Sequence, residues 1–217
     1  MSVSLPATHD AANAERTALK EWAVLCDALA HGEIIAMVRK GGIREQRSGF
    51  AVRHDRFLLY PTFFHEKSAE LQPRFAERVG LTATTRPPDG TIRIAHVADV
   101  AAVWHVRDLE RLRAIEPFHG MAWPAVVSRF EYRGVPEVRV VAVRLSRLTA
   151  PHDVAETRRY QGCVSWVELD DPIDTANATP VLPSALLDEQ LARLKEALGA
   201  PEPQAPAGNQ HAIGDKL

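Results

Sequence analysis

The stretch EVRVVAVRLSRL, residues 137–148, decides the fold class. Its apolar positions are crowded with valine and leucine, and three arginines are mixed among them. β-Branched residues favour extended backbone and pack well against neighbouring strands. We therefore expect this segment to be a long central strand, with the other elements arranged around it.

Shorter segments on both sides have strand composition or helical periodicity. The expected strands cover residues 34–39, 50–52, 57–60, 91–97 and 164–169. The expected helices cover residues 17–31, 68–79, 108–115, 124–132 and 183–198. The first helix is predicted because Leu19, Trp22, Cys26 and Leu29 recur every three or four positions before Gly32.

Strands and helices follow one another without a strict alternation, which disfavours a parallel doubly wound sheet. The sequence thus predicts an α+β fold, in which helices pack on a mixed or mainly antiparallel sheet. We expect one domain over residues 15–198, which includes the helix near 183–198. Residues 1–14 and 199–217 are predicted to be disordered, the latter because it is rich in Ala, Pro, Gly and Gln.

The composition of the 217 residues is that of an ordinary globular protein, with 46% hydrophobic and 25% charged residues. No apolar run approaches the roughly 20 residues needed to cross a bilayer. Residues 1–13 lack a basic region followed by an apolar one, so a secretory signal is not expected. We expect a cytoplasmic protein whose two cysteines are reduced thiols.

Basic residues are concentrated between residues 39 and 56, although the whole chain has a net charge of -2. Backbone amides of a glycine turn, flanked by cations, can hold a phosphate group. The alternative is a hairpin turn with solubilising charges, and the P-loop spacing is absent. The candidate anion-binding residues are Arg39, Lys40, Gly41, Gly42, Arg44 and Arg53.

Four residues are candidates for acid–base or nucleophilic chemistry, namely His54, His65, His119 and Cys163. Ordinary hydrogen-bonded histidines and an inert buried thiol are the alternative. The histidine spacing matches no standard zinc pattern, and neither HExxH nor CxxC occurs. We therefore predict no metal site and no cofactor.

Aromatic residues near these positions could stack on a base or an apolar ligand. The candidates are Tyr60, Trp123, Tyr160 and Trp166. The alternative is that these rings fill the hydrophobic core.

Several of these residues together resemble a bacterial family, the domain of unknown function 1802. The resemblance covers roughly residues 19–198 and implies a loose association with restriction or defence systems. Its motifs are the Arg-Lys-Gly-Gly-Ile stretch at 39–43, Glu45, Phe50, His54, Phe57, Tyr60-Pro61-Thr62, His65, His119, Trp123, Arg129 and Tyr160-x-Gly162-Cys163-x-Ser165-Trp166.

A fainter resemblance connects the chain with the PUA-like superfamily, whose members bind RNA or modified bases on a small twisted barrel. Its ASCH branch has the pattern Gly-x-Lys-x-x-Glu-x-Arg. Gly32 and Arg39 keep this spacing, whereas Ile34 and Met37 replace the Lys and the Glu.

Three hypotheses follow from the sequence. The first is a binding module for nucleic acid or a nucleotide, because cations and aromatic residues are interleaved between residues 39 and 60. The second is an enzyme that uses the His and Cys candidates on a small substrate, which requires them to converge. The third is a subunit of a larger assembly that docks through the helix at 183–198.

Overall fold

The computed structural model describes residues 13–40, 54–63, 66–162 and 164–203. In these ranges seven strands form one sheet, in the order β2-β5-β4-β3-β1-β6, with β7 paired to β5. β1 and β3 are parallel and the other pairs are antiparallel. The predicted single-domain α+β fold with a mixed sheet is confirmed. The strands are β1 (Ala14–Trp22), β2 (Ala36–Arg39), β3 (Arg56–Thr62), β4 (Thr91–Val106), β5 (Val138–Ala155), β6 (Trp166–Asp174) and β7 (Thr179–Pro180).

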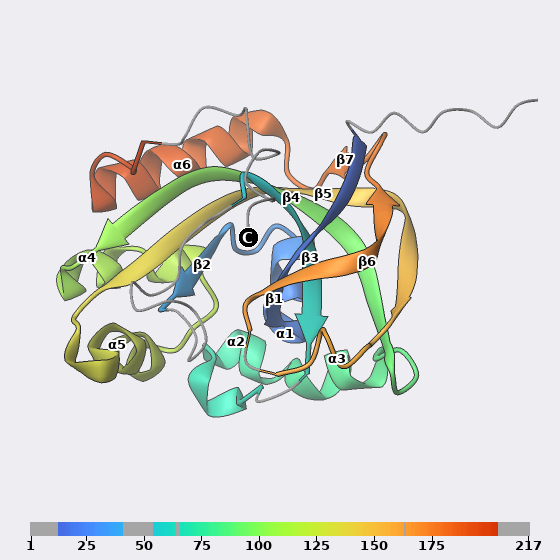
Figure 1. Ribbon diagram of the computed structural model, residues 1–217. Helices are drawn as coiled ribbons and strands as arrows, with labels where there is room; N and C mark the ends of the chain where they lie inside the picture. The colour runs from blue at the N-terminus through green and yellow to red at the C-terminus, as the bar shows by residue number, and fades with distance from the viewer. Residues whose placement is uncertain (1–12, 41–53, 64–65, 163, 204–217) are drawn as a thin grey trace, which may run out of the picture.

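The strand that decides the fold, β5, lies between β2 and β4, as predicted from its composition. It pairs with β4 from Val106↔Val138 to Thr91↔Ala155, with two register shifts on the way. Figure 1 shows the two strands as long curved ribbons that arch over α1 (Ala23–Ala30). Both strands continue well past the segments predicted for them, and each contributes residues to two separate hydrophobic clusters.

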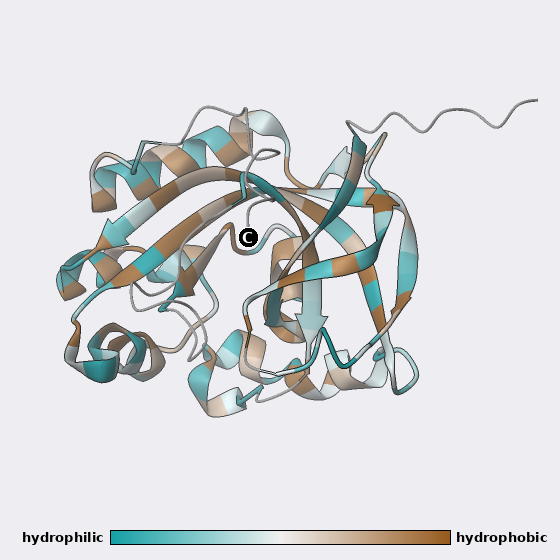
Figure 2. Ribbon diagram, viewed as in Figure 1, coloured by the Kyte–Doolittle hydropathy of each residue, from teal (hydrophilic) through white to brown (hydrophobic). Residues whose placement is uncertain are grey.

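The remaining helices cover the ends and the outer side of this arch (Figure 1). α4 (Leu109–Ala114), α5 (Trp123–Glu131) and α6 (Ser184–Leu198) confirm the helices predicted at 108–115, 124–132 and 183–198. Figure 2 shows that hydrophobic residues are frequent on α1 and along β4 and β5. The larger hydrophobic cluster joins these elements to α6 through Leu187, Leu194 and Leu198.

The helix predicted over residues 17–31 is wrong in its first half. Residues up to Trp22 form β1, and only Ala23–Ala30 is helical. β1 lies between β3 and β6 and is covered on both faces, so Leu19 enters the larger cluster while its neighbour Ala18 enters the smaller one. A strand that is buried on both faces lacks polar alternation, and its apolar residues then combined with those of α1 into a helical spacing.

The helix predicted over residues 68–79 is replaced by three short pieces. These are the 3₁₀ turn η2 (Ser68–Glu70), α2 (Pro73–Ala76) and α3 (Val79–Thr84). Pro73 begins α2, where a missing N–H costs nothing. β6 starts two residues later than predicted and extends to Asp174, and the strand predicted at 50–52 lies outside the described residues. No helix of the described ranges is long and apolar enough to cross a membrane.

Candidate functional site

A buried ion pair lies where β1 passes into α1. The carboxylate of Glu21 is 5% exposed, and its Oε2 accepts a hydrogen bond from Nη1 of Arg39 at 3.1 Å. Arg39 also donates to the backbone oxygen of Lys20 at 3.1 Å. Arg39 belongs to β2 and Glu21 to β1, although β5, β4 and β3 separate these strands in the sheet. The arched sheet therefore brings its distant strands together at this point.

A second guanidinium group reaches the same place from α5. Nη1 of Arg129 donates to the backbone oxygen of Val38 at 2.9 Å, and the guanidinium carbon lies 5.4 Å from the centre of the Trp22 ring. The pKa of Arg129 is lowered, mainly by burial; the positive charge of Arg39 also lowers it, and the negative charges of Glu21 and Glu70 raise it. Within the described part of the chain, no carboxylate forms an ion pair with Arg129. We call Glu21, Trp22, Arg39 and Arg129 the Glu21 cluster.

The start of α1 connects this cluster to another carboxylate. α1 has no side-chain cap from its own N-terminal residue, and Oε1 of Glu66 accepts a hydrogen bond from the N–H of Val24 at 2.9 Å instead. Burial raises the pKa of Glu66, this hydrogen bond lowers it, and the charge of Glu21 raises it. Burial also raises the pKa of Cys26, whose thiol donates to the backbone oxygen of Glu21 at 3.6 Å. Cys26 is therefore a protonated, structural thiol.

His119 is buried, with 1% of its surface exposed. Its Nδ1 accepts a hydrogen bond from the N–H of Met121 at 3.2 Å, so the neutral ring carries its proton on Nε2. Nε2 is buried and has no hydrogen-bond partner among the described residues. Burial lowers the pKa of His119 to about 4, and the positive charges of Arg129 and Arg74 lower it further. The imidazole is therefore a neutral donor near Arg129.

The rings of two candidate residues, Trp166 at the start of β6 and His54 just before β3, lie close together beside β1. Trp166 is paired in register with Leu19, two residues before Glu21. Its ring centre is 5.2 Å from that of His54 and 5.3 Å from that of Phe57, the latter in an edge-to-face arrangement. Trp166 and His54 thus lie together at the end of β1 that carries the Glu21 cluster.

The comparisons with known proteins give a family. The model described as "Domain of unknown function (DUF1802)" matches residues 18–193. The chain belongs to this family. No curated protein matches the DUF1802 chain.

Two similar solved structures are ASCH proteins from Zymomonas mobilis, the branch of the fainter resemblance. One is a mutant, with a TM-score of 0.43 and 12% identity over 72% of this chain and 89% of that chain. The other has a TM-score of 0.38 and 12% identity over 82% of this chain and 94% of that chain.

Lys40 of the DUF1802 chain, a predicted phosphate contact, lies against backbone oxygens. Its ammonium group donates to the carbonyl oxygens of Phe130 at 3.0 Å and Glu137 at 2.7 Å, and also to that of Val135. Burial lowers its pKa, while the charge of Glu137 raises it. Lys40 thus ties the end of β2 to the connection between α5 and β5, and a phosphate contact at Lys40 stays a prediction.

The two tyrosines predicted to stack on a ligand are both buried in the smaller hydrophobic cluster. Tyr60 is 1% exposed and donates from its hydroxyl to Oε1 of Glu156 at 3.4 Å. Tyr160 is also 1% exposed, and its hydroxyl accepts from the N–H of Asp170 at 2.6 Å. Burial raises the pKa of both hydroxyl groups. As placed here, both rings are part of the core.

Trp123 begins α5 and is partly buried, with the guanidinium carbon of Arg113 4.5 Å from its ring centre. The remaining candidates, namely Gly41, Gly42, Arg44, Arg53, His65 and Cys163, lie outside the described residues. In the described ranges no group of three or more His, Cys, Asp or Glu side chains is placed to hold a metal ion.

Sequence reasoning missed Glu21 and Trp22 as site residues. Glu21 is the acidic residue directly before Trp22 and α1, and its burial there requires a cation. That signal was available once residues 14–22 were recognised as a strand. Nothing in the sequence indicates which cation it would meet.

Proposed function

We propose that this DUF1802 protein is a binding module for single-stranded nucleic acid or a nucleotide. The Glu21 cluster would hold a phosphate group, and the neighbouring rings would contact a base. Proteins that bind single strands combine cations along the backbone with aromatic side chains on which bases stack. The described residues place both kinds of group at one end of β1.

The observation that carries the proposal is the position of Arg129. Its guanidinium group lies over the Trp22 ring and is partly buried, and Glu21, the nearby carboxylate, already pairs with Arg39. The charges of Glu21 and Glu70 act on Arg129, but no carboxylate of the described residues forms an ion pair with it. An anion at this place would pair directly with Arg129, and the planar guanidinium fork suits a phosphate group.

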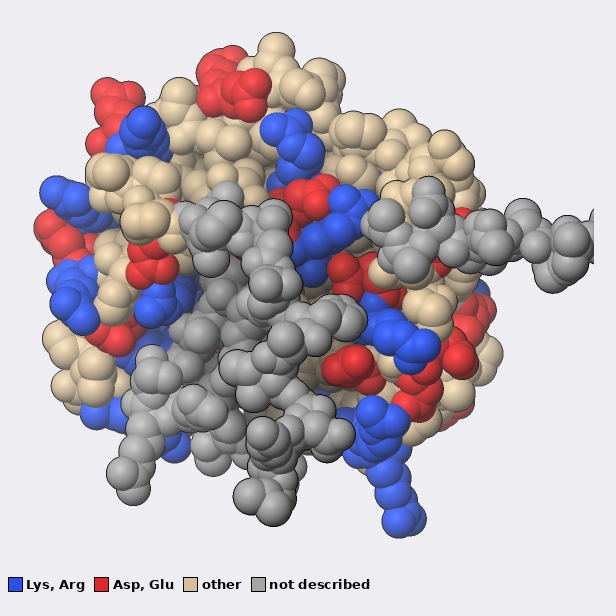
Figure 3. Space-filling view, turned by 45° about the horizontal axis from the view of Figure 1, so that its top comes forward, with Lys and Arg blue, Asp and Glu red and all other residues tan. Residues whose placement is uncertain are grey.

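The described surface around the molecule carries charges of both signs. Figure 3 shows blue and red side chains interspersed over the visible face. Exposed arginines among the described residues also form ion pairs, as Arg93 does with Asp153 at 2.7 Å. This pattern favours a site for one or a few nucleotides over a surface that coats nucleic acid through bulk charge.

The enzyme hypothesis has less support. Of its four candidates, only His54 and His119 are among the described residues, and no contact given by the structure joins them. The restriction or defence association that the resemblance implies has no structural counterpart in the described residues. Neither idea contributes to the proposal.

The test is the binding of labelled single-stranded RNA and DNA oligomers, and of mononucleotides, at several salt concentrations. The unmodified protein should bind, and its affinity should fall as salt rises, because binding releases counterions. Arg129→Gln should lower the affinity about tenfold, a loss of about 1.4 kcal/mol. It should also reduce the salt slope by about 0.7, the value of one phosphate contact on a single strand.

The matched control is Arg193→Gln on α6, where an exposed arginine lies 5.0 Å from the ring centre of Phe118. It removes the same charge and the same kind of ring contact away from β1, and it should leave the affinity unchanged. Arg129→Lys keeps the charge if Arg129→Gln folds poorly. Absence of binding at low salt, or equal losses in both glutamine variants, would refute the proposal.

A further inference from the structure

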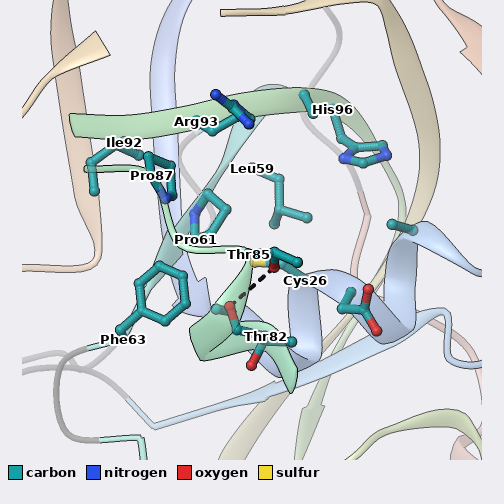
Figure 4. A pocket seen from close by; sticks show the side chains of 14 residues that line it. Cys26, Leu59, Pro61, Phe63, Thr82, Thr85, Pro87, Ile92, Arg93 and His96 are labelled. Carbon is teal, nitrogen blue, oxygen red and sulfur yellow. Dashed lines mark hydrogen bonds between the residues drawn. The ribbon is translucent and has the colours of Figure 1, made fainter. Parts of the chain in front are cut away.

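A second candidate site is a cavity of about 240 Å³ between α1, α3, β3 and β4 (Figure 4). Much of its wall is apolar, with Leu59, Pro61, Phe63, Pro87 and Ile92 among the lining residues. An apolar protein cavity of about 150 Å³ is large enough to bind benzene. The space between these elements therefore suffices for a compound of two fused rings, and none of its lining residues belongs to the Glu21 cluster.

The charged groups on the cavity wall already have partners. Asp27 lies 3.7 Å from Nη1 of Arg78 and 3.4 Å from Nδ1 of His31. Arg93 forms a two-pronged ion pair with Asp153, at 2.7 and 2.8 Å. A charged ligand would have to leave water without gaining a new opposite charge, which is unfavourable. The cavity thus favours an uncharged occupant.

His96 is a polar group on this wall with unused hydrogen-bonding capacity. Figure 4 shows it on β4, across the cavity from Thr82 of α3. Its Nε2 is buried and has no hydrogen-bond partner among the described residues. Burial lowers the pKa of His96 to about 4, and the charges of Arg147 and His31 lower it further. At neutral pH the ring is uncharged, with one nitrogen that donates and one that accepts.

From the cavity and its unpaired histidine we infer a binding site for a small, uncharged, heteroaromatic compound of one or two fused rings. The ring system would lie against Leu59, Phe63 and Ile92. A polar atom on its edge would exchange a hydrogen bond with the imidazole of His96. A buried nitrogen without a partner costs free energy, so a ligand that pairs with it gains affinity over one of the same shape that cannot.

The experiment is a titration of the full chain with two probes of nearly the same shape, followed by protein-observed NMR. Benzimidazole carries one donor and one acceptor nitrogen, whereas indene carries neither. Benzimidazole should bind about five-fold more tightly, the value of one neutral hydrogen bond. His96→Phe keeps a ring at the position and should remove this preference.

A second variant tests the cavity itself. Ala30→Leu, at the end of α1, adds three carbons to the wall and should weaken the binding of both probes by about tenfold or more. Ala192→Leu on the exposed side of α6 makes the same change away from the cavity and should have no effect. The inference fails if neither probe binds, if Ala30→Leu binds both as well as the unmodified protein does, or if the preference for benzimidazole survives in His96→Phe.

Discussion

Glu21 and Lys20 are neighbours on β1 whose side chains lie on opposite faces of the sheet. The ammonium group of Lys20 donates to the backbone oxygens of Tyr160 and, at 3.2 Å, of Gly162, and lies 5.5 Å from the Tyr60 ring centre. On the Glu21 face, by contrast, Glu21 pairs with Arg39, and no carboxylate of the described residues forms an ion pair with Arg129. The contacts of Lys20 with backbone oxygens hold the fold together, whereas Arg129 has no ion-pair partner among the described residues and is the group that we propose to meet a ligand.

The largest loss of stability is expected from breaking the buried ion pair between Glu21 and Arg39. Glu21→Gln removes the negative charge from a buried ion pair with Arg39. The free energy of unfolding should fall by about 3 kcal/mol, the usual cost of removing one partner of a buried pair. Urea unfolding of the variant and of the unmodified protein measures this loss of stability.

Asp153→Asn is the matched control, because it makes the same change in the half-exposed pair with Arg93. Ion pairs in solvent contribute little, so its unfolding midpoint should hardly move. Similar midpoints for the two variants would remove the distinction between the Glu21 cluster and an ordinary surface pair.

An effect of pH on the free energy of unfolding is also expected, through His119. Its pKa is about 4 in the folded protein and about 6.5 when unfolded, so between these values the unfolded state binds more protons. Stability should therefore fall as the pH drops through this window, by up to about 1.4 kcal/mol per pH unit. Below pH 4 both states are protonated and the loss is complete.

Urea unfolding at several pH values measures this contribution. His119→Asn retains an acceptor for the Met121 N–H and removes the titrating ring, so its stability should depend less on pH. If the variant and the unmodified protein have the same pH dependence between 4 and 6.5, His119 is not buried as a neutral ring.

The smallest loss of stability is expected from a substitution on the Lys20 face of β1. Tyr160→Phe deletes the hydroxyl that accepts from the Asp170 N–H and should cost about 1 kcal/mol of unfolding free energy. Oligonucleotide affinity should not change, because the ring is buried away from the Glu21 cluster. A loss of affinity would mean that the Lys20 face takes part in binding.

The sequence predicted those strands and helices whose own residue pattern is enough to identify them. β5 is recognisable from its valines, and α6 from leucines at helical spacing. β1 was mistaken for a helix because its burial on both faces hides the alternation by which a strand is recognised. The boundary at Trp22 could not be found while the two elements formed one continuous apolar pattern.

The candidate site was harder to predict than the fold. Arg39 was selected for its charge, yet its partner Glu21 lies on a strand that meets β2 only because the sheet arches. The role of Lys40 depends on three backbone oxygens of the α5–β5 connection, which no local pattern indicates. The cavity at His96 needs four separate elements to form. Contacts of this kind follow from the tertiary arrangement alone.

The most direct test of the central claim compares the two faces of β1 in one binding assay. Arg129→Gln and Lys20→Gln each remove one positive charge, the first from the Glu21 face and the second from the Lys20 face. Both variants are first shown to be folded. Arg129→Gln should then bind single-stranded oligonucleotide about tenfold more weakly than the unmodified protein, a change of about 1.4 kcal/mol. Lys20→Gln should bind the oligonucleotide as tightly as the unmodified protein does. Equal losses, or a larger loss for Lys20→Gln, would contradict the assignment of the ligand to the Glu21 cluster.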